Sequence, residues 1–405
     1  MKKIIKYIFL FLIMFLFITP VKAYEVPEVS SQSILFTNLD TGEVIYEKNA
    51  DEKRMFASIT KVMTALVSID NIKNFDEKVM VTWDMLKDID IDYSMAGFKT
   101  GDTVTYDELL YGVMLPSGAD ATNILGISIG GTFENFANMM NEKAKEIGME
   151  NTHFTNTIGV DDPNHYSTAR DITKMMKYAY SNENFMKYAS TEEYQLTSID
   201  KLLKGPVSKM HKDYNMNYVI GGKTGFTEEA GDCLATISEN NKSKFILVTL
   251  GADYTNKYQH MEDQKVIYEY FFNNYDYKKI LSKGDTLVKL KTIYDVSYTI
   301  KSDENVTKYI DKMVTKDDLI YEYSGIKKLG KKVKKGDKLG TYYIKLKDEV
   351  LYQKDIYSPS DVKMTLEYFI KDNIVFYSVS LCLIIILFII LLKKRKRRRR
   401  KKRRK

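Results

Sequence analysis

The stretch FASITKVMTAL, residues 56–66, sets the first question about this chain. In a helix, residues three apart share a face, so Ser58 and Lys61 point the same way, and Val62 and Ala65 continue that apolar side. A buried lysine has a lowered pKa and can take the proton of a nearby hydroxyl. The spacing therefore suits a serine nucleophile activated without histidine. A helix start, with Ser58 near the N-cap and Lys61 reaching solvent, explains the same letters.

The first 23 residues have the plan of a secretory signal. Three early lysines precede an apolar run over residues 8–18, and small residues follow at Val21 and Ala23. The alternative is an uncleaved anchor, although the run is short for a membrane span. We expect cleavage after residue 23 and a mature chain that begins outside the cytoplasm at Tyr24.

The other end of the chain predicts a membrane anchor. Residues 374–392 carry no charge and are long enough to cross about 30 Å of hydrocarbon as a helix. Thirteen consecutive basic residues, 393–405, follow. Directly after a span, such a run is typical of a cytoplasmic stop signal that also holds anionic lipid, so we expect no nucleic-acid partner.

Charge and cysteine content describe the part between the ends. The chain has a net charge of +7, but without the thirteen tail charges and the four N-terminal lysines residues 24–392 carry −10. The only cysteines are Cys233 and Cys382, and the second lies in the predicted span. No disulfide framework is expected, so the exported part must be stabilised by core burial.

The sequence pattern predicts a catalytic domain over residues 24–277. In residues 33–49, apolar and polar side chains alternate on both sides of an Asp-Thr-Gly turn, which predicts a β-hairpin. Helical patterns run from residue 56 to about 182, and Thr168 with Asp171 forms a capping-box start. Strands return in NYVIGGKTGF, CLATISE and KFILVTLGA, before a helix over residues 256–275. The order predicts one discontinuous sheet covered by helices.

A second, all-β domain is expected over residues 278–360. Short alternating strands are separated there by turns rich in lysine, glycine and aspartate. Residues 361–373 would link this domain to the span.

Two later motifs strengthen the serine–lysine hypothesis. LPSGAD places Ser117 in a turn between helical segments, and GGKTGFT places Lys223 and Thr224 on an apolar strand. A lysine and a threonine at a strand edge can hold a carboxylate, while Gly225 admits close approach of a substrate.

Together these motifs resemble those of D-alanyl-D-alanine carboxypeptidases, the low-molecular-mass penicillin-binding proteins with an S-x-x-K nucleophile. The similarity runs from LDTGEVIYEKN through ASITKVMTAL, LPSGADATN, DDPNHYSTARD and GGKTGFTEEAG to the β domain and anchor. It implies an α/β (α+β) serine β-lactamase-like fold, with an antiparallel sheet and a helical insertion. It also implies peptidoglycan pentapeptides as substrate, β-lactams as inhibitors and no cofactor.

The resemblance assigns a role to each motif residue. Ser58 attacks the terminal D-Ala-D-Ala carbonyl, Lys61 is the base, and Ser117 relays the proton to the leaving amine. The free carboxylate of the substrate binds at the K-T-G motif. The residues implied for substrate binding are Lys223, Thr224, Gly225 and Phe226, the last through its backbone N–H in an oxyanion hole shared with Ser58.

One position departs from the family pattern. The second motif is usually Ser-x-Asn, whereas here Ala119 has no amide to hold the substrate or Lys61. A protein that binds penicillin or peptidoglycan without useful turnover, as a scaffold, is therefore the alternative function. The sequence leaves turnover, the stage of growth, the exact muropeptide, the oligomeric state and the reactivity of Cys233 open.

Other catalytic readings have weaker support. GISIG, residues 126–130, matches a nucleophile elbow around Ser128 but lacks the required strand before it. We expect no metal site, because the histidines show no ligand spacing; they are His153, His165, His211 and His260. His165 is expected to serve as a structural hydrogen-bonding residue.

Overall fold

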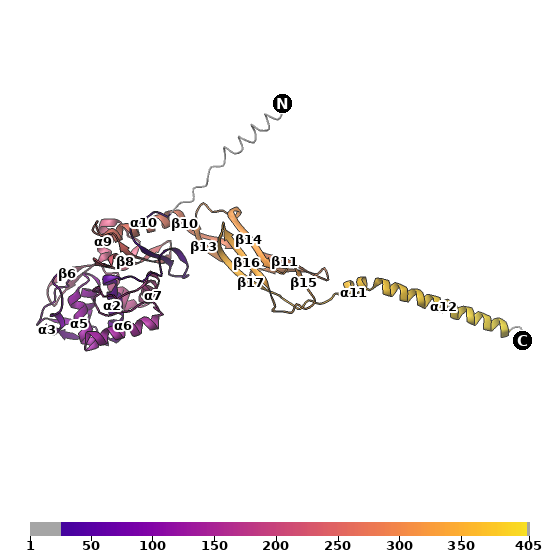
Figure 1. The fold of residues 1–405 in the computed structure, drawn as a ribbon, viewed down its shortest axis with the longest axis horizontal. Helices are drawn as coiled ribbons and strands as arrows, with labels where there is room; N and C mark the ends of the chain where they lie inside the picture. The colour runs from indigo at the N-terminus through magenta and orange to yellow at the C-terminus, as the bar shows by residue number, and fades with distance from the viewer. Residues whose placement is uncertain (1–25, 403–405) are drawn as a thin grey trace, which may run out of the picture. The chain divides into compact units, whose positions relative to one another are not determined.

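The structure, a computed structural model, describes residues 26–402, so the predicted signal segment, residues 1–23, lies outside the described residues. The chain divides into two compact units, with the boundary between Asn273 and Asn274 (Figure 1). Each unit has its own hydrophobic core.

The N-terminal unit is built on a five-stranded antiparallel sheet with the order β2-β1-β9-β8-β7. The first two strands form the hairpin predicted over residues 33–49, and the other three contain the later strand patterns. Chain segments about 200 residues apart thus pair edge to edge. The strands are β1 (Ser33–Asn38), β2 (Val44–Lys48), β7 (Val219–Thr227), β8 (Gly231–Asn240) and β9 (Ser243–Ala252).

Helices cover both faces of this sheet. The predicted C-terminal helix of the unit is α10 (Gln259–Asn274), and its Gln264 and Tyr268 bond Thr236 of β8 at 2.6 and 2.7 Å. The helical region between β2 and β7 packs on the other face. Its elements are η1 (Ala57–Ile59), α2 (Thr60–Asn71), α3 (Trp83–Leu86), α4 (Tyr106–Met114), α5 (Ala119–Gly130), α6 (Phe133–Ile147), α7 (Ala169–Tyr180), α8 (Glu183–Ala189) and α9 (Pro206–Tyr214). Two small hairpins interrupt it: β3 (Lys78–Met80) with β4 (Thr103–Thr105), and β5 (Glu193–Leu196) with β6 (Lys201–Lys204).

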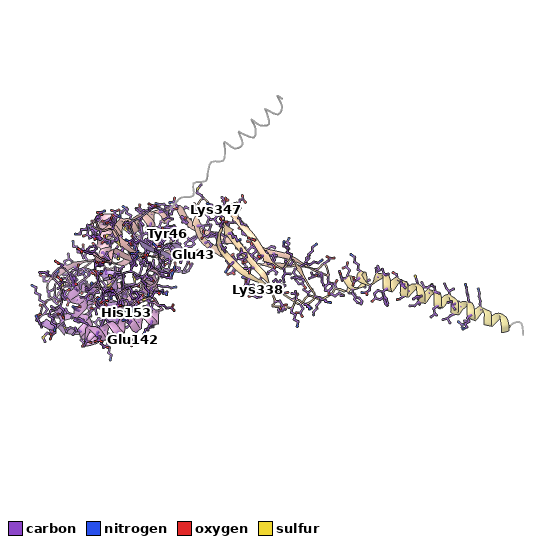
Figure 2. All side chains as sticks on the ribbon, viewed as in Figure 1. Glu43, Tyr46, Glu142, His153, Lys338 and Lys347 are labelled. Atoms are coloured by element: carbon purple, nitrogen blue, oxygen red, sulfur yellow. The ribbon has the colours of Figure 1, made fainter. Side chains whose placement is uncertain are left out.

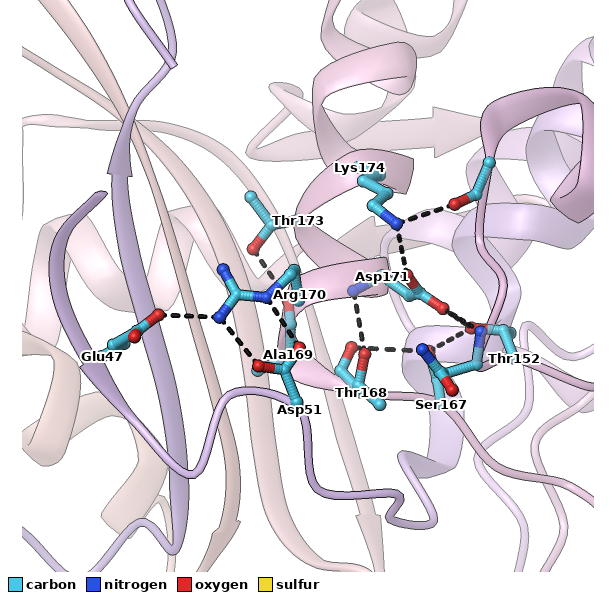
Figure 3. Close-up of polar contacts among 12 residues, drawn as sticks. Glu47, Asp51, Thr152, Ser167, Thr168, Ala169, Arg170, Asp171, Thr173 and Lys174 are labelled. Carbon is cyan, nitrogen blue, oxygen red and sulfur yellow. Dashed lines mark hydrogen bonds and ion pairs between the residues drawn. The ribbon is translucent and has the colours of Figure 1, made fainter. Parts of the chain in front are cut away.

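The start of α7 was predicted as a capping box, and half of that prediction is realised. The Thr168 hydroxyl accepts a hydrogen bond from the Asp171 N–H at 3.0 Å. The buried carboxylate of Asp171 instead accepts from Thr152 at 3.0 Å and pairs with Lys174 at 2.9 Å (Figure 3). The aspartate therefore ties α7 to a neighbouring loop. A short aspartate that already has two tertiary partners does not reach back to the N-cap.

The preceding residue, Arg170, joins α7 to the β2 region. Its guanidinium donates to both carboxylate oxygens of Asp51 at 2.7 and 2.9 Å and to Glu47 at 2.8 Å (Figure 3). The bidentate pair lowers the pKa of Asp51. The geometry fixes the hairpin against the helix that begins beside it.

The C-terminal unit is all-β up to residue 357, as its sequence pattern predicts. Three small sheets have the orders β10-β13, β12-β11-β15 and β14-β16-β17. The strand pairs β10–β13 and β11–β15 were not expected from the sequence. The strands are β10 (Tyr275–Leu281), β11 (Thr286–Thr292), β12 (Ser297–Lys301), β13 (Val306–Asp311), β14 (Leu319–Gly325), β15 (Lys328–Leu329), β16 (Lys338–Leu346) and β17 (Glu349–Tyr357), with a turn η2 (Lys316–Asp318).

Two helices follow the β sandwich. The first is α11 (Leu366–Asp372), and the second is α12 (Ile374–Lys402). The segment Ile374–Lys396 of α12 is long and apolar enough to cross a membrane. Its unbroken helix matches the expected anchor by length and composition.

Candidate active site

The predicted nucleophile and base meet at the start of α2. Ser58 lies in the 3₁₀ turn η1 and Lys61 in the first turn of α2, so residues three apart eclipse one another. The Lys61 Nζ lies 2.8 Å from the Ser58 Oγ and 2.8 Å from the carbonyl oxygen of Ile158. Lys61 is only 1% exposed. Of the two interpretations of FASITKVMTAL, the inward-facing lysine is correct.

Two glycines, one in a distant loop and one in strand β7, allow the turn that carries Ser58. Ala57, just before the nucleophile, has a φ of +47°, a left-handed conformation rare for a residue with a side chain. A Cβ at Gly159 would lie 2.0 Å from the Ala57 carbonyl oxygen, and one at Gly225 would lie 2.9 Å from the Ser58 nitrogen. The glycine of the K-T-G motif is therefore required by the protein's own backbone. This requirement adds to the close approach of substrate that the sequence predicts for Gly225.

His165 supports the same turn through the hydroxyl of Thr60. The Thr60 hydroxyl donates to the Ala57 carbonyl at 2.7 Å and accepts from the His165 Nε2 at 2.7 Å. The His165 Nδ1 accepts from the Thr155 N–H at 3.1 Å, which assigns the neutral tautomer protonated at Nε2. Burial lowers the pKa of His165 to about 4. The residue is thus a neutral structural histidine, as predicted.

Asn156 holds the carbonyl that Lys61 contacts. Its side-chain oxygen accepts hydrogen bonds from the N–H groups of Ile158, Gly159 and Val160 at 3.2, 2.7 and 3.1 Å. The loop therefore wraps around one uncharged amide. No sequence signal had pointed to this residue, because its role depends on a loop reached only after folding.

The second serine forms its own pair with a lysine. The Lys223 Nζ donates to the Ser117 Oγ at 2.9 Å and to the carbonyl oxygen of Thr224 at 2.9 Å. Ser117 has a φ of +62°, so this position too is strained. Ala119 follows within the first turn of α5, and its N–H donates to the Ser94 carbonyl at 2.8 Å.

Asp120 fixes the loop beside Ser117. Its carboxylate accepts hydrogen bonds from the N–H groups of three consecutive residues at 2.6 to 2.9 Å, and Asp120 is fully buried. The donors are Ala96, Gly97 and Phe98. Asp120 belongs to the LPSGAD motif, but its sequence position alone does not predict this role.

Both lysines are electrostatically unusual. Burial lowers the pKa of Lys61 far below its ordinary value, and the charge of Lys223 lowers it further, while Asp120 raises it. Burial lowers the pKa of Lys223 to about 7. Two ammonium groups in one buried region repel each other, so both burial and the charge of Lys223 favour the neutral form of Lys61.

A groove of about 1250 Å³ gives access to these groups. Its lining includes six of the seven predicted site residues: Ser58, Lys61, Ser117, Thr224, Gly225 and Phe226. Among the described residues that line the groove, Lys223 is not found, because it lies fully buried behind Ser117. The Phe226 side chain is 49% exposed and packs edge-on to Tyr254.

The competing sites are not formed. Ser128 lies inside α5, so GISIG has no strand before the serine and is not a nucleophile elbow. Burial raises the pKa of Cys233 to about 12, so its thiol stays protonated and unreactive at neutral pH. Within residues 26–402, no group of three or more histidine, cysteine or acidic side chains is arranged to hold a metal ion.

Comparison with known proteins now identifies the chain. The sequence model of the family described as D-alanyl-D-alanine carboxypeptidase (Peptidase_S11) matches residues 20–254. The chain belongs to this family. It is a serine-type D-Ala-D-Ala carboxypeptidase with a penicillin-binding-protein fold, and β-lactam binding is typical of that fold.

Curated relatives and solved structures agree with this assignment. The D-alanyl-D-alanine carboxypeptidase DacF of Bacillus subtilis is 29% identical over 341 residues, 82% of this chain and 86% of the relative. The D-alanyl-D-alanine carboxypeptidase of Streptomyces sp. (strain K15) is 34% identical over 236 residues, 53% of this chain and 79% of the relative. The crystal structure of DacD from Francisella tularensis has a TM-score of 0.69, covers 84% of this chain and 95% of its own, and is 22% identical. This last match is a likeness of fold.

Proposed function

We propose that this carboxypeptidase removes the terminal D-alanine of peptidoglycan stem peptides through an acyl-enzyme on Ser58. Neutral Lys61 takes the hydroxyl proton across 2.8 Å as the Ser58 oxygen attacks the carbonyl. The backbone N–H groups of Ser58 and Phe226 hold the oxyanion. The C–N bond then breaks as Ser117 relays the proton that Lys61 took from Ser58 to the leaving amine, and water then hydrolyses the ester and frees Ser58.

The substrate carboxylate binds at the second serine–lysine pair. Thr224 offers its hydroxyl from the groove wall, and Lys223 supplies positive charge from behind Ser117. A carboxylate close to this ammonium raises the pKa of Lys223 and keeps it charged. The opposite protonation states of the two lysines therefore match their two tasks.

We further propose that the enzyme is held at the outer face of the cell membrane. Residues 1–23 act as an export signal, residues 24–277 form the catalytic domain, and residues 278–360 form the β domain. Residues 361–373 link it to a single span over residues 374–392. The basic tail, residues 393–405, then lies in the cytoplasm and contacts anionic lipid.

The observation that carries the catalytic proposal is the 2.8 Å contact between Ser58 and a buried lysine that lacks a carboxylate partner among the described residues. The test is intact-mass spectrometry of the detergent-solubilised full chain with penicillin, beside Ser58→Ala. We expect a penicilloyl adduct on the wild type and none on the variant. The absence of an adduct on a folded wild-type protein would refute the proposal.

A second assay separates turnover from binding. Release of D-alanine from a diacetyl-Lys-D-Ala-D-Ala peptide is expected from the wild type, because Lys61 is fully positioned by Ser58 and Ile158 without help from residue 119. Penicillin labelling without D-alanine release would instead support the scaffold alternative.

A further inference from the structure

A run of six lysines in the C-terminal unit has no role in the proposed catalysis. Residues 327–335, here called the lysine loop, contain lysine at 327, 328, 331, 332, 334 and 335. All six are exposed, and within the described part of the chain none of them forms a salt bridge. The loop therefore presents six positive charges that remain available to a partner.

The backbone of the lysine loop is held in place by packing and hydrogen bonds within the C-terminal unit. Leu329 is fully buried in the core of the unit, and Val333 packs against that core. The nearby carboxylates serve the backbone: Asp337 accepts from the Lys334 N–H and Asp361 from the Lys335 N–H, both at 2.9 Å. These two carboxylates hydrogen-bond the backbone, and within the described residues neither forms an ion pair with a lysine of the loop.

The loop belongs to the end of the unit that leads to the membrane span. The Val362 N–H donates to the Val333 carbonyl at 3.0 Å, and Ile374, where α12 begins, is twelve residues further along the chain. Seven of the intervening residues form α11, so this connection spans at most about 30 Å. Tyr368 of α11 also packs against Tyr294, with ring centroids 5.0 Å apart.

Lysines that lie far from the lysine loop, at the other end of strand β16, provide a comparison. Figure 2 shows Lys338 and Lys347 at the two ends of β16, which separates them by about 30 Å. Lys338 lies three residues after the end of the lysine loop. Lys347 lies in the far turn, and strand pairing places Lys301 away from the loop as well.

We propose that the lysine loop binds anionic phospholipid headgroups on the surface of the membrane that α12 crosses. The proposal rests on α12 spanning the membrane and is independent of the reaction at Ser58. Each lysine within a Debye length of an anionic surface strengthens binding about fivefold. The exposed apolar residues of α11 suit the same interface; they are Leu366, Phe369 and Ile370. Headgroup binding would hold the β unit against the bilayer.

The test uses the full chain in nanodiscs of two compositions. One contains phosphatidylcholine alone, and the other contains equal amounts of phosphatidylcholine and phosphatidylglycerol. Lysines are acetylated briefly and quantified by mass spectrometry, with Lys301 and Lys347 as internal references. We expect the loop lysines to be acetylated about fivefold more slowly, relative to the references, only in the anionic discs, and we expect high salt to remove this protection.

Two matched variants decide the cause. Replacing lysines 331, 332, 334 and 335 by glutamine should abolish the protection of Lys327 and Lys328, whereas glutamine at position 283, with both reference lysines kept, should leave it intact. Hydrogen exchange of β16 and β17 reports whether each variant keeps its fold. The proposal is overturned if the loop lysines react as fast as the reference lysines in both kinds of disc. It is also overturned if they are protected to the same extent with and without anionic lipid. A chain that fails to co-purify with the discs refutes the span itself.

Discussion

The two serine–lysine pairs of the active site have similar contacts but different electrostatic surroundings. In each pair, a buried lysine lies within 3 Å of a serine hydroxyl and contacts one backbone carbonyl. Around Lys61, the loop is held by the neutral amide of Asn156, whereas the loop beside Ser117 is held by the carboxylate of Asp120. The comparison teaches that two lysines with similar contacts can differ in charge coupling: Lys223 lowers and Asp120 raises the pKa of Lys61, whereas burial alone explains the lowered pKa of Lys223.

The mutual repulsion of the lysines makes this difference functional. Lys223 lowers the pKa of Lys61, while its own pKa, about 7, is explained by burial. In the proposed mechanism, this difference assigns proton transfer to Lys61 and carboxylate binding to Lys223.

The largest effect is expected from Lys61→Met, which keeps the side-chain volume and removes the base. The rate of acylation by a fluorescent penicillin should fall by about 10³-fold. The thermal unfolding temperature should stay the same or rise, because a desolvated amine has been replaced by an apolar group. Acylation within tenfold of the wild-type rate would show that Lys61 is not the base.

The second test changes the other lysine. Lys223→Met should lower kcat/KM for the D-Ala-D-Ala peptide by about 10²- to 10³-fold, since the carboxylate loses its cation. It should also raise the pKa of Lys61 and move the acid limb of the penicillin acylation profile to higher pH. Ser117→Ala is the control, since it keeps both lysines and should leave that limb in place.

A third test concerns the close approach of the K-T-G strand to the nucleophile. Gly225→Ala would place a Cβ 2.9 Å from the Ser58 nitrogen and should slow acylation about 10²-fold by displacing the serine. Gly222→Ala meets an equally close atom, the Ala235 carbonyl oxygen at 2.9 Å, but does not touch Ser58. If both variants slow acylation equally, general destabilisation of the strand is the cause.

Of the two serine–lysine pairs, only the Ser58–Lys61 pair should lose stability in acid, because His165 supports the turn that carries Ser58. The pKa of His165 is about 4 in the fold against about 6.5 unfolded, so the unfolded chain binds more protons between these values. The stabilisation is complete above pH 6.5 and is lost as the pH falls towards 4, by about 3 kcal/mol in the free energy of unfolding. Denaturant titrations of wild type and His165→Gln measure it, and an unchanged slope against pH in the variant contradicts the assignment.

The smallest effect is expected from Asn156→Asp. A carboxylate can accept the same three backbone hydrogen bonds, but its charge raises the pKa of Lys61. The acid limb of the acylation profile should move up by about one pH unit. Asp120→Asn, which removes a carboxylate that raises the same pKa, should move the limb in the opposite direction.

The sequence predicted those elements whose conformation depends on short-range patterns of residues. The hairpin of residues 33–49, the inward face of Lys61 and the strand around Lys223 follow from periodicity and motif spacing. Two features could not be predicted from the sequence: the burial of Lys223 behind Ser117, and the three backbone hydrogen bonds accepted by Asn156 beside Lys61. Both depend on contacts between segments about 100 residues apart. The pairing of β10 with β13 did not follow from the local pattern either, although these strands lie only about 30 residues apart.

The contact between Gly159 and Ala57 links the chemistry to the order of folding. The turn that aims Ser58 can form only after a loop about 100 residues later and a strand about 170 residues later have reached it, which is a costly set of long-range closures. A molecule that reacts with penicillin has therefore completed its long-range assembly. Labelled penicillin can thus serve as a conformational probe that counts correctly folded molecules after secretion, and it requires neither an antibody nor a purified sample.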